Sequence, residues 1–314
     1  MTPINVKEAA AFLMGCDGCL IYTHASPDGD TLGSASALAL ILRSLGKEAF
    51  VYSPDGIPKK LKFLPTDGLF VKNELAGLIP ISVDVASTKL LGNAKNTRFE
   101  LSIDHHKVNT VDCERLLCMA DRIACGEIIY MIATELEAKL TKDVALCIYT
   151  AISSDSGGFR YEATKPETHI IAAKCIETGI DFADVNRRLF ESKTVEQVAL
   201  IRTAYKNLEL LRNGSFAIVA LRPEEVEKCG ADENDFDCIN PIPREIAGVR
   251  ASAVIRKKGD IIKVSLRSND DTDVAEMAAN FGGGGHIHAA GFSLNCDFDT
   301  ALETVRKLFS EYER

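Results

Sequence analysis

The sequence predicts an α/β fold with two domains, and three observations lead to that prediction. First, apolar runs that suit buried strands alternate with stretches of helical periodicity in the first half of the chain. Such alternation is typical of a mostly parallel sheet with helices on its faces. Second, an amphipathic helical pattern over 190–212 ends at Asn213 and Gly214, and a smaller set of strand and helix patterns follows it. Third, the 314 residues suffice for two domains of ordinary size.

The first domain is predicted over residues 1–189. Its strands are expected at four apolar runs, the last two of which carry an aspartate near the end: 19–23, 50–53, 78–85 and 99–104. Its helices are expected where apolar residues recur at helical spacing: 31–45, 123–140 and 142–152.

Residues 190–212 are predicted to form a helical linker, and residues 213–314 a second, smaller α/β domain. Strands of this domain are expected at three apolar runs: 216–221, 248–256 and 261–267. Helices are expected at two further stretches: 273–280 and 299–312.

The composition, 46% hydrophobic and 26% charged residues, is typical of a soluble globular protein. No apolar run approaches the roughly 18 residues that a membrane helix needs, and the N-terminus lacks the pattern of a signal peptide. We therefore expect a cytoplasmic protein without a membrane partner. Among ten scattered cysteines, Cys16 and Cys19 are the only close pair, and their role stays open.

The net charge of −9 argues against tight binding of long nucleic acid, which needs a broad basic surface. A small anionic substrate is still compatible with it, because bound metal ions would supply positive charge locally. Residues 241–270 depart from the average, with seven Lys and Arg against three Asp and Glu.

Polar clusters follow several of the predicted strands. His24, Asp28 and Asp30 come after the first strand, in a segment whose Pro and Gly favour a tight turn. Carboxylate oxygens with an imidazole suit Mn²⁺ or Mg²⁺, and we expect no nearby cysteine to make the site softer. A loop whose acids only cap the following helix is the alternative interpretation.

Further acids and histidines follow later elements. Asp84 ends one predicted strand, and Asp104 ends another, directly before His105 and His106. Asp155 lies in a turn of small residues, Ser153 to Gly158. Because ligands bind beyond the carboxyl ends of strands in such sheets, we expect these clusters to converge at one edge.

The second domain contains an unusual glycine run, Gly282 to Gly285, followed by His286 and His288. Successive glycines expose backbone N–H groups and leave room for a close-approaching anion. A flexible loop is the alternative.

These motifs, in this order, resemble those of the DHH phosphoesterase superfamily with a C-terminal DHHA1 domain: HASPDGD, VDVAS, DHH, SSDSGGFR and GGGGHIHAAG. Within it, the compact chain is similar to the oligoribonuclease and 3′-phosphoadenosine-5′-phosphate (PAP) phosphatase family. The resemblance covers nearly the whole chain. It implies an N-terminal, mostly parallel-sheet DHH domain, a smaller α/β DHHA1 domain and an active site in the cleft between them.

The resemblance also implies a centre of two Mn²⁺ ions, with Mg²⁺ as the alternative. His24 and Asp28 would bind the first ion, and Asp30 and His105 the second. The residues that would be shared between the two ions are Asp84 and Asp155.

Asp104 would orient a histidine, and His106 would contact the phosphate or protonate the leaving oxygen. A substrate clamp in the second domain would consist of Arg267, Gly283, Gly284, Gly285 and His286. The resemblance assigns no role to His288.

We therefore expect a phosphoesterase that hydrolyses short oligoribonucleotides, dinucleotides or PAP, and that does not bind long double-stranded nucleic acid. The alternatives are a cyclic-di-AMP phosphodiesterase, a single-strand exonuclease and a non-catalytic nucleotide sensor. The preferred substrate, the polarity of cleavage and the oligomeric state, including a homodimer, stay open.

Overall fold

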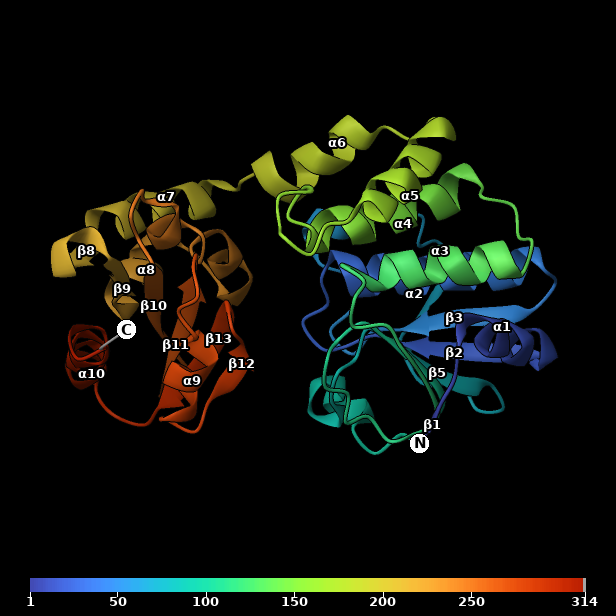
Figure 1. Ribbon diagram of the computed structural model, residues 1–314, viewed down its shortest axis with the longest axis horizontal. Helices are drawn as coiled ribbons and strands as arrows, with labels where there is room; N and C mark the ends of the chain where they lie inside the picture. Colours follow the sequence, from blue (N-terminus) through green and yellow to red (C-terminus); the bar gives the residue numbers. More distant parts are fainter. Residues whose placement is uncertain (313–314) are drawn as a thin grey trace. The chain divides into compact units, whose positions relative to one another are not determined.

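The computed structural model of the chain describes residues 1–312, apart from the side chains of Glu233, Asn234 and His286. The chain forms two compact units, Met1–Ser192 and a second one that begins at Lys193 (Figure 1). Each unit combines one sheet with helices, so the predicted α/β fold with a large parallel sheet and a smaller second sheet is confirmed.

The first unit is built on a seven-stranded sheet in the order β1-β7-β6-β5-β2-β3-β4, in which every pair is parallel. Its strands are β1 (Thr2–Pro3), β2 (Gly18–Tyr22), β3 (Glu48–Tyr52), β4 (Phe70–Val71), β5 (Ile79–Val83), β6 (Phe99–Asp104) and β7 (Cys113–Cys118). From β2 the chain passes first to β3 on one side and then, through β5, to the other side. This reversal brings the carboxyl ends of β2, β5 and β6 next to one another, where ligands bind in open α/β sheets.

Helices lie on one side of this sheet. They are α1 (Val6–Gly15), α2 (Gly29–Ser44), α3 (Cys125–Glu135), α4 (Lys142–Asp155), α5 (Pro166–Glu177) and α6 (Phe182–Asn186). Of these, α5 and α6 pack on α4 as an outer layer. One apolar core joins α2, α3 and α4 to inward-facing strand residues such as Ile21 and Ile103. The opposite face packs Tyr22 and Phe99 against the 3₁₀ helix η2 (Thr88–Ala94).

Two glycines of α2 allow α4 to approach closely. A Cβ atom at Gly33 would lie 2.5 Å from the carbonyl oxygen of Cys147, and one at Gly29 would lie 2.6 Å from the Cβ atom of Ser154. This close packing carries the end of α4 toward the start of α2, where Asp28 caps the helix by accepting two backbone N–H groups. The predicted turn at Ser153 to Gly158 therefore begins only at Ser156, and Asp155 is the last residue of α4 and not a turn residue.

The predicted helical linker over 190–212 is wrong as a single helix. A π-helical turn, Arg187–Glu191, ends the first unit, and α7 (Val195–Lys206) starts the second with a capping box between Thr194 and Gln197. The following residues form β8 (Leu208–Leu211), which pairs antiparallel with β9, and the partly buried Leu208 packs against a core of the second unit.

The second unit has a six-stranded sheet in the order β12-β13-β11-β10-β9-β8. Its further strands are β9 (Phe216–Leu221), β10 (Ala251–Lys258), β11 (Ile261–Ser268), β12 (Gly284–His286) and β13 (Ala289–Leu294). One core includes residues of α9 (Val274–Ala279) and α10 (Phe298–Ser310), and another includes residues of α7. Helix α8 (Pro223–Cys229) follows β9.

No helix among residues 1–312 combines the length and apolar character that a membrane crossing needs.

Candidate metal centre

The predicted ligands of the first unit meet at the carboxyl edge of the parallel sheet. His24 follows β2, Asp84 follows β5, and Asp104 ends β6 directly before His105 and His106. Because β2, β5 and β6 are neighbours in the sheet, three consecutive strands deliver these side chains to one place.

Asp84 lies between the histidines of two strands. Its Oδ2 atom is 3.7 Å from His24 Nε2, and its Oδ1 atom is 3.4 Å from His105 Nε2. The residue is buried and has a φ angle of 60°, in the left-handed region that only a few non-glycine residues adopt. Each carboxylate oxygen therefore faces a different imidazole, as a residue shared by two cations would require.

The first ligand group consists of His24, Asp28 and Asp84, whose candidate atoms all lie within 4.8 Å of one another. His24 Nε2 is 3.8 Å from Asp28 Oδ1. The other ring nitrogen, Nδ1, is 2.8 Å from the carbonyl oxygen of Ala25. Since a carbonyl oxygen only accepts hydrogen bonds, Nδ1 carries a proton, and Nε2 is the ring nitrogen that would bind an ion once it has lost its own proton.

The second ligand group contains Asp30, Asp84, His105 and Cys125, again within 4.8 Å. His105 Nε2 lies 3.7 Å from Asp30 Oδ2 and 3.6 Å from Asp155 Oδ2, so α4 adds a further carboxylate here. The Asp30 carboxylate accepts the backbone N–H of Cys125 at 2.7 Å, while its other oxygen accepts the N–H of Gly126 and the Ser34 hydroxyl.

Cys125 is a residue that sequence reasoning missed. Its buried Sγ atom lies 3.7 Å from Asp84 Oδ1, so the expectation of a site without a nearby cysteine is wrong. Cys125 begins α3 and is far in sequence from every predicted ligand, and only the parallel sheet order brings it to the carboxyl edge. No local pattern could have identified it.

Asp104 and His106 form a second layer beside these groups. Asp104 Oδ1 accepts a hydrogen bond from His106 Nδ1 at 2.7 Å and another from the His105 backbone at 2.8 Å. Asn109, which the sequence did not single out, donates to Asp104 Oδ2 at 2.6 Å and to the carbonyl oxygen of Val85 at 2.9 Å. The rings of His105 and His106 are inclined at 61°, so the adjacent histidines face different directions.

Crowding of buried carboxylates shapes the electrostatics of the centre. Burial, reinforced by the charge of Asp84, raises the pKa of Asp30 to about 8. Burial alone would lower the pKa of His24 and His105, but their carboxylate neighbours outweigh it and raise these values to about 9 and about 11. The site thus holds more negative charge than its imidazoles can neutralise, which a divalent cation would compensate.

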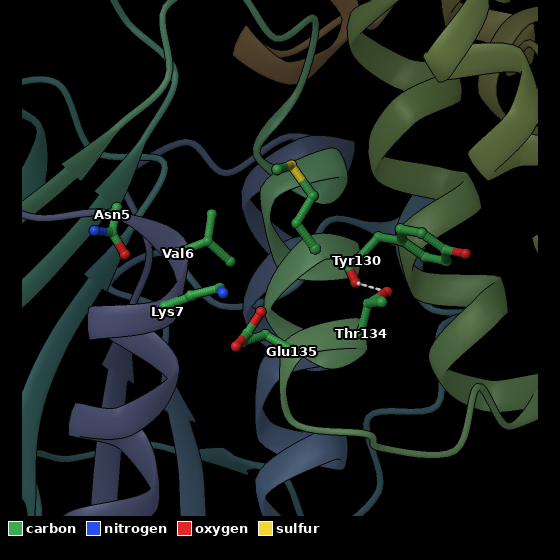
Figure 2. Close-up of a pocket in the computed structure, with 7 residues that line it drawn as sticks. Asn5, Val6, Lys7, Tyr130, Thr134 and Glu135 are labelled. Carbon is green, nitrogen blue, oxygen red and sulfur yellow. Dashed lines mark hydrogen bonds between the residues drawn. The ribbon is translucent and has the colours of Figure 1, made fainter.

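The donor set fits divalent ions. Asp84 belongs to both ligand groups and also to a third cluster with Asp104 and His106, whose Nδ1 atom is engaged by Asp104. Carboxylate oxygens and imidazole nitrogens of this kind suit Mn²⁺ and, with fewer imidazoles, Mg²⁺. A separate pocket of about 550 Å³ lies between α1 and α3, where Lys7, Tyr130 and Glu135 belong to its lining (Figure 2). Its lining residues are different from those of the two ligand groups.

The predicted clamp residues belong to the second unit. Gly284 and Gly285 lie in β12, so the predicted glycine loop is in part an edge strand paired with β13. A Cβ atom at Gly285 would lie 2.4 Å from the carbonyl oxygen of Ala289, and one at Gly283 would lie 2.3 Å from that of Gly291, so close strand contact requires both glycines.

Arg267 lies on β11 and donates to the carbonyl oxygen of Leu266. His288 lies 3.0 Å, through Nδ1, from the Ser268 hydroxyl. The side chain of His286 is outside the described side chains. The clamp function of these residues therefore stays a prediction.

Together, the parallel sheet and the ligand groups at its carboxyl edge define an α/β protein with a candidate site for divalent cations. Comparison with known proteins specifies its kind. The DHH family, N-terminal domain, matches residues 19–152, and the DHHA1 domain matches residues 218–311. The bifunctional oligoribonuclease and PAP phosphatase NrnA of Thermus thermophilus is 30% identical over 313 residues, which cover 98% of this chain and 94% of the relative. The protein of the same name from Bacillus subtilis is 25% identical, over 95% of this chain and 96% of its own.

Solved structures share the fold. An exopolyphosphatase-related protein from Bacteroides fragilis superimposes with a TM-score of 0.89 at 23% identity, covering 98% of this chain and 96% of its own. RecJ from Thermus thermophilus, in complex with Mn²⁺, gives a TM-score of 0.56 at 14% identity and covers 98% of this chain and 55% of its own. The chain therefore belongs to the DHH family of phosphoesterases, with a C-terminal DHHA1 domain, and is a hydrolase that acts on phosphate ester bonds.

Proposed function

We propose that this phosphoesterase uses two divalent ions to hydrolyse short oligoribonucleotides and dinucleotides, and the 3′-phosphate of PAP. The observation that carries the proposal is the pair of ligand groups that share Asp84, in a chain that matches an oligoribonuclease and PAP phosphatase over nearly its whole length. Two bound ions would polarise the phosphate and lower the pKa of a water between them.

The residues would divide the work as follows. His24 and Asp28 would hold the first ion, Asp30 and His105 would hold the second, and Asp84 would be shared by the two. Asp155 lies beside His105 and adds a carboxylate to the second position. Mn²⁺ is the proposed ion, because the imidazole nitrogens favour it over Mg²⁺.

His106 is the proposed catalytic residue that contacts substrate. The hydrogen bond from its Nδ1 to Asp104 raises the pKa of His106, which favours a protonated ring that can donate to a leaving oxygen. Asp104 is itself fixed by Asn109, so a chain of hydrogen bonds orients the imidazole.

Arg267, Gly283, Gly284, Gly285 and His286 are proposed to bind a phosphate of the substrate. A contact to a second phosphate of the substrate would favour short substrates. The cytoplasmic location and a homodimeric state stay predictions.

A substrate panel with Mn²⁺ tests the proposal. It should contain PAP, linear dinucleotides, cyclic di-AMP, a long single-stranded RNA and pyrophosphate. We expect PAP and linear dinucleotides to be cleaved best, and chelation by EDTA to abolish cleavage. Preferential degradation of the long RNA would favour the single-strand exonuclease, whereas activity that survives complete chelation would eliminate the metal-dependent mechanism.

A further inference from the structure

The second ligand group contains a thiol, whereas the first contains only oxygen and nitrogen donors. Cys125 Sγ, Asp30, Asp84 and His105 offer four candidate ligand atoms within 4.8 Å of one another. The first group offers His24, Asp28 and Asp84. The two positions therefore differ in chemical softness, which governs the choice among divalent cations.

Three separations within the second group are close to those between ligands of one tetrahedral divalent ion. Zinc bonds of about 2.3 Å to sulfur and about 2.0–2.1 Å to nitrogen and oxygen give ligand separations of about 3.3–3.5 Å in a tetrahedron. His105 Nε2 lies 3.4 Å from Asp84 Oδ1 and 3.7 Å from Asp30 Oδ2, and Cys125 Sγ lies 3.7 Å from Asp84 Oδ1. Each measured separation is within a few tenths of an ångström of the expected one.

The backbone holds the cysteine in this place. The N–H group of Cys125 donates to Asp30 Oδ2 at 2.7 Å, and the next N–H, of Gly126, donates to Asp30 Oδ1 at 3.0 Å. The start of α3 is thereby tied to one ligand of the group while its first side chain reaches another, Asp84. The thiol is fully buried, so it is protected from bulk oxidants.

We propose that Cys125 Sγ is a further ligand of the second position, beside its carboxylates and its imidazole, and makes it selective for a thiophilic divalent ion such as Zn²⁺ or Co²⁺. On binding, the Sγ–H bond breaks, its proton passes to the solvent, and an Sγ–metal bond forms. The first position, without sulfur, keeps its preference for Mn²⁺, so the centre can hold two different metals. This inference rests on the two-metal centre of the proposed function and adds a ligand to it.

The test is spectroscopic and uses the full-length, metal-free protein titrated with Co²⁺. The wild type should develop a near-ultraviolet sulfur-to-cobalt charge-transfer band, and Cys125→Ser should lack it. Cys175→Ser is the matched control, because Cys175 is also fully buried but lies on α5, outside both ligand groups. In competition titrations, Cys125→Ser should lose at least about tenfold in Zn²⁺ affinity and less than about threefold in Mn²⁺ affinity.

A measurement on the wild type covers the case in which Cys125→Ser does not fold. X-ray absorption of protein loaded with one equivalent of Zn²⁺ should show one sulfur at about 2.3 Å. A shell of oxygen and nitrogen alone, or an undiminished cobalt band in folded Cys125→Ser, would overturn the inference. In either case, intact Mn²⁺-dependent cleavage would still support the proposed function. Absence of any metal binding would contradict both this inference and the proposed function.

Discussion

The position of the Asp84 carboxylate determines how the two ligand groups are arranged. Its left-handed backbone conformation costs about 1–3 kcal/mol in a residue other than glycine. In return, the turn after β5 aims a buried carboxylate between His24 and His105, where an extended continuation of the strand would not place it. Aspartate tolerates this conformation better than most residues, since its short polar side chain suits it.

Replacement of Asp84 by Asn should reduce metal affinity and activity together. Asn adopts the left-handed region readily, so the fold should survive, but a neutral amide cannot serve two cations as a carboxylate does. We expect a loss of more than about 100-fold in kcat/KM and in Mn²⁺ affinity. Bound Mn²⁺ and turnover should be measured beside Asp112→Asn, whose carboxylate is exposed and outside the ligand groups. Full metal content in Asp84→Asn would contradict the shared role.

At the scale of elements, hydrophobic periodicity predicted correctly those strands whose position depends on the local sequence. The strands at 19–23, 99–104 and 216–221 lie within a residue of the observed ones, because their apolar runs are buried on both faces. The prediction of a helical linker was wrong, since Leu208 to Leu211 pair with β9 in a sheet edge that exists only after folding. Cys125 was missed because the topology of the sheet, and not its neighbours in sequence, brings it to the centre. Asn109 is only five residues from Asp104, but the loop conformation that turns its amide toward this carboxylate is not visible in the sequence.

The packing of α2 on α4 depends on Gly33, and it positions Asp155, a predicted metal ligand at the end of α4. Gly33→Ala should destabilise the first unit by about 1–3 kcal/mol, because the new methyl group would overlap the carbonyl oxygen of Cys147 and push α4 away. Asp155, at the end of α4, would move with it, so Mn²⁺ affinity should fall as well. Gly15→Ala is the control, since no atom lies within 4 Å of its added Cβ. Denaturant unfolding and metal titration measure both effects, and equal behaviour of the two variants would refute the packing argument.

At the scale of the whole molecule, the two units divide the predicted tasks. All predicted metal ligands lie between His24 and Asp155, in the first unit, and the predicted clamp lies after residue 240, in the second. Stability of the first unit should therefore depend on metal, and recognition of substrate on the second.

The chelated protein should lose stability as the pH rises from about 6 to about 9. The folded-state pKa of Asp30, about 8, is above its unfolded value, so its protonated form stabilises the fold only until the pH passes that value. The raised pKa values of His24 and His105, about 9 and about 11, act in the same direction. Mn²⁺ should raise the melting temperature and reduce this fall, because it binds the folded state. Melting curves with and without EDTA provide the measurement, and a chelated protein that is more stable at the higher pH would contradict it.

Arg267→Ala should separate substrate recognition from metal chemistry. Arg267 lies on β11 and contributes nothing to the two ligand groups, so bound Mn²⁺ should be unchanged. Hydrolysis of a small artificial diester such as bis-p-nitrophenyl phosphate should suffer little, because this ester has no second phosphate to grip. The kcat/KM for cleavage of a dinucleotide should fall about 10- to 100-fold, through KM, kcat or both, depending on whether the contact is stronger in the transition state.

The control variant is Lys257→Ala, which removes an exposed positive charge from the neighbouring strand β10 and so tests for a general electrostatic effect. An equal loss with both substrates would show that Arg267 acts on the fold or the metals, and it would remove the physical reason for preferring short substrates.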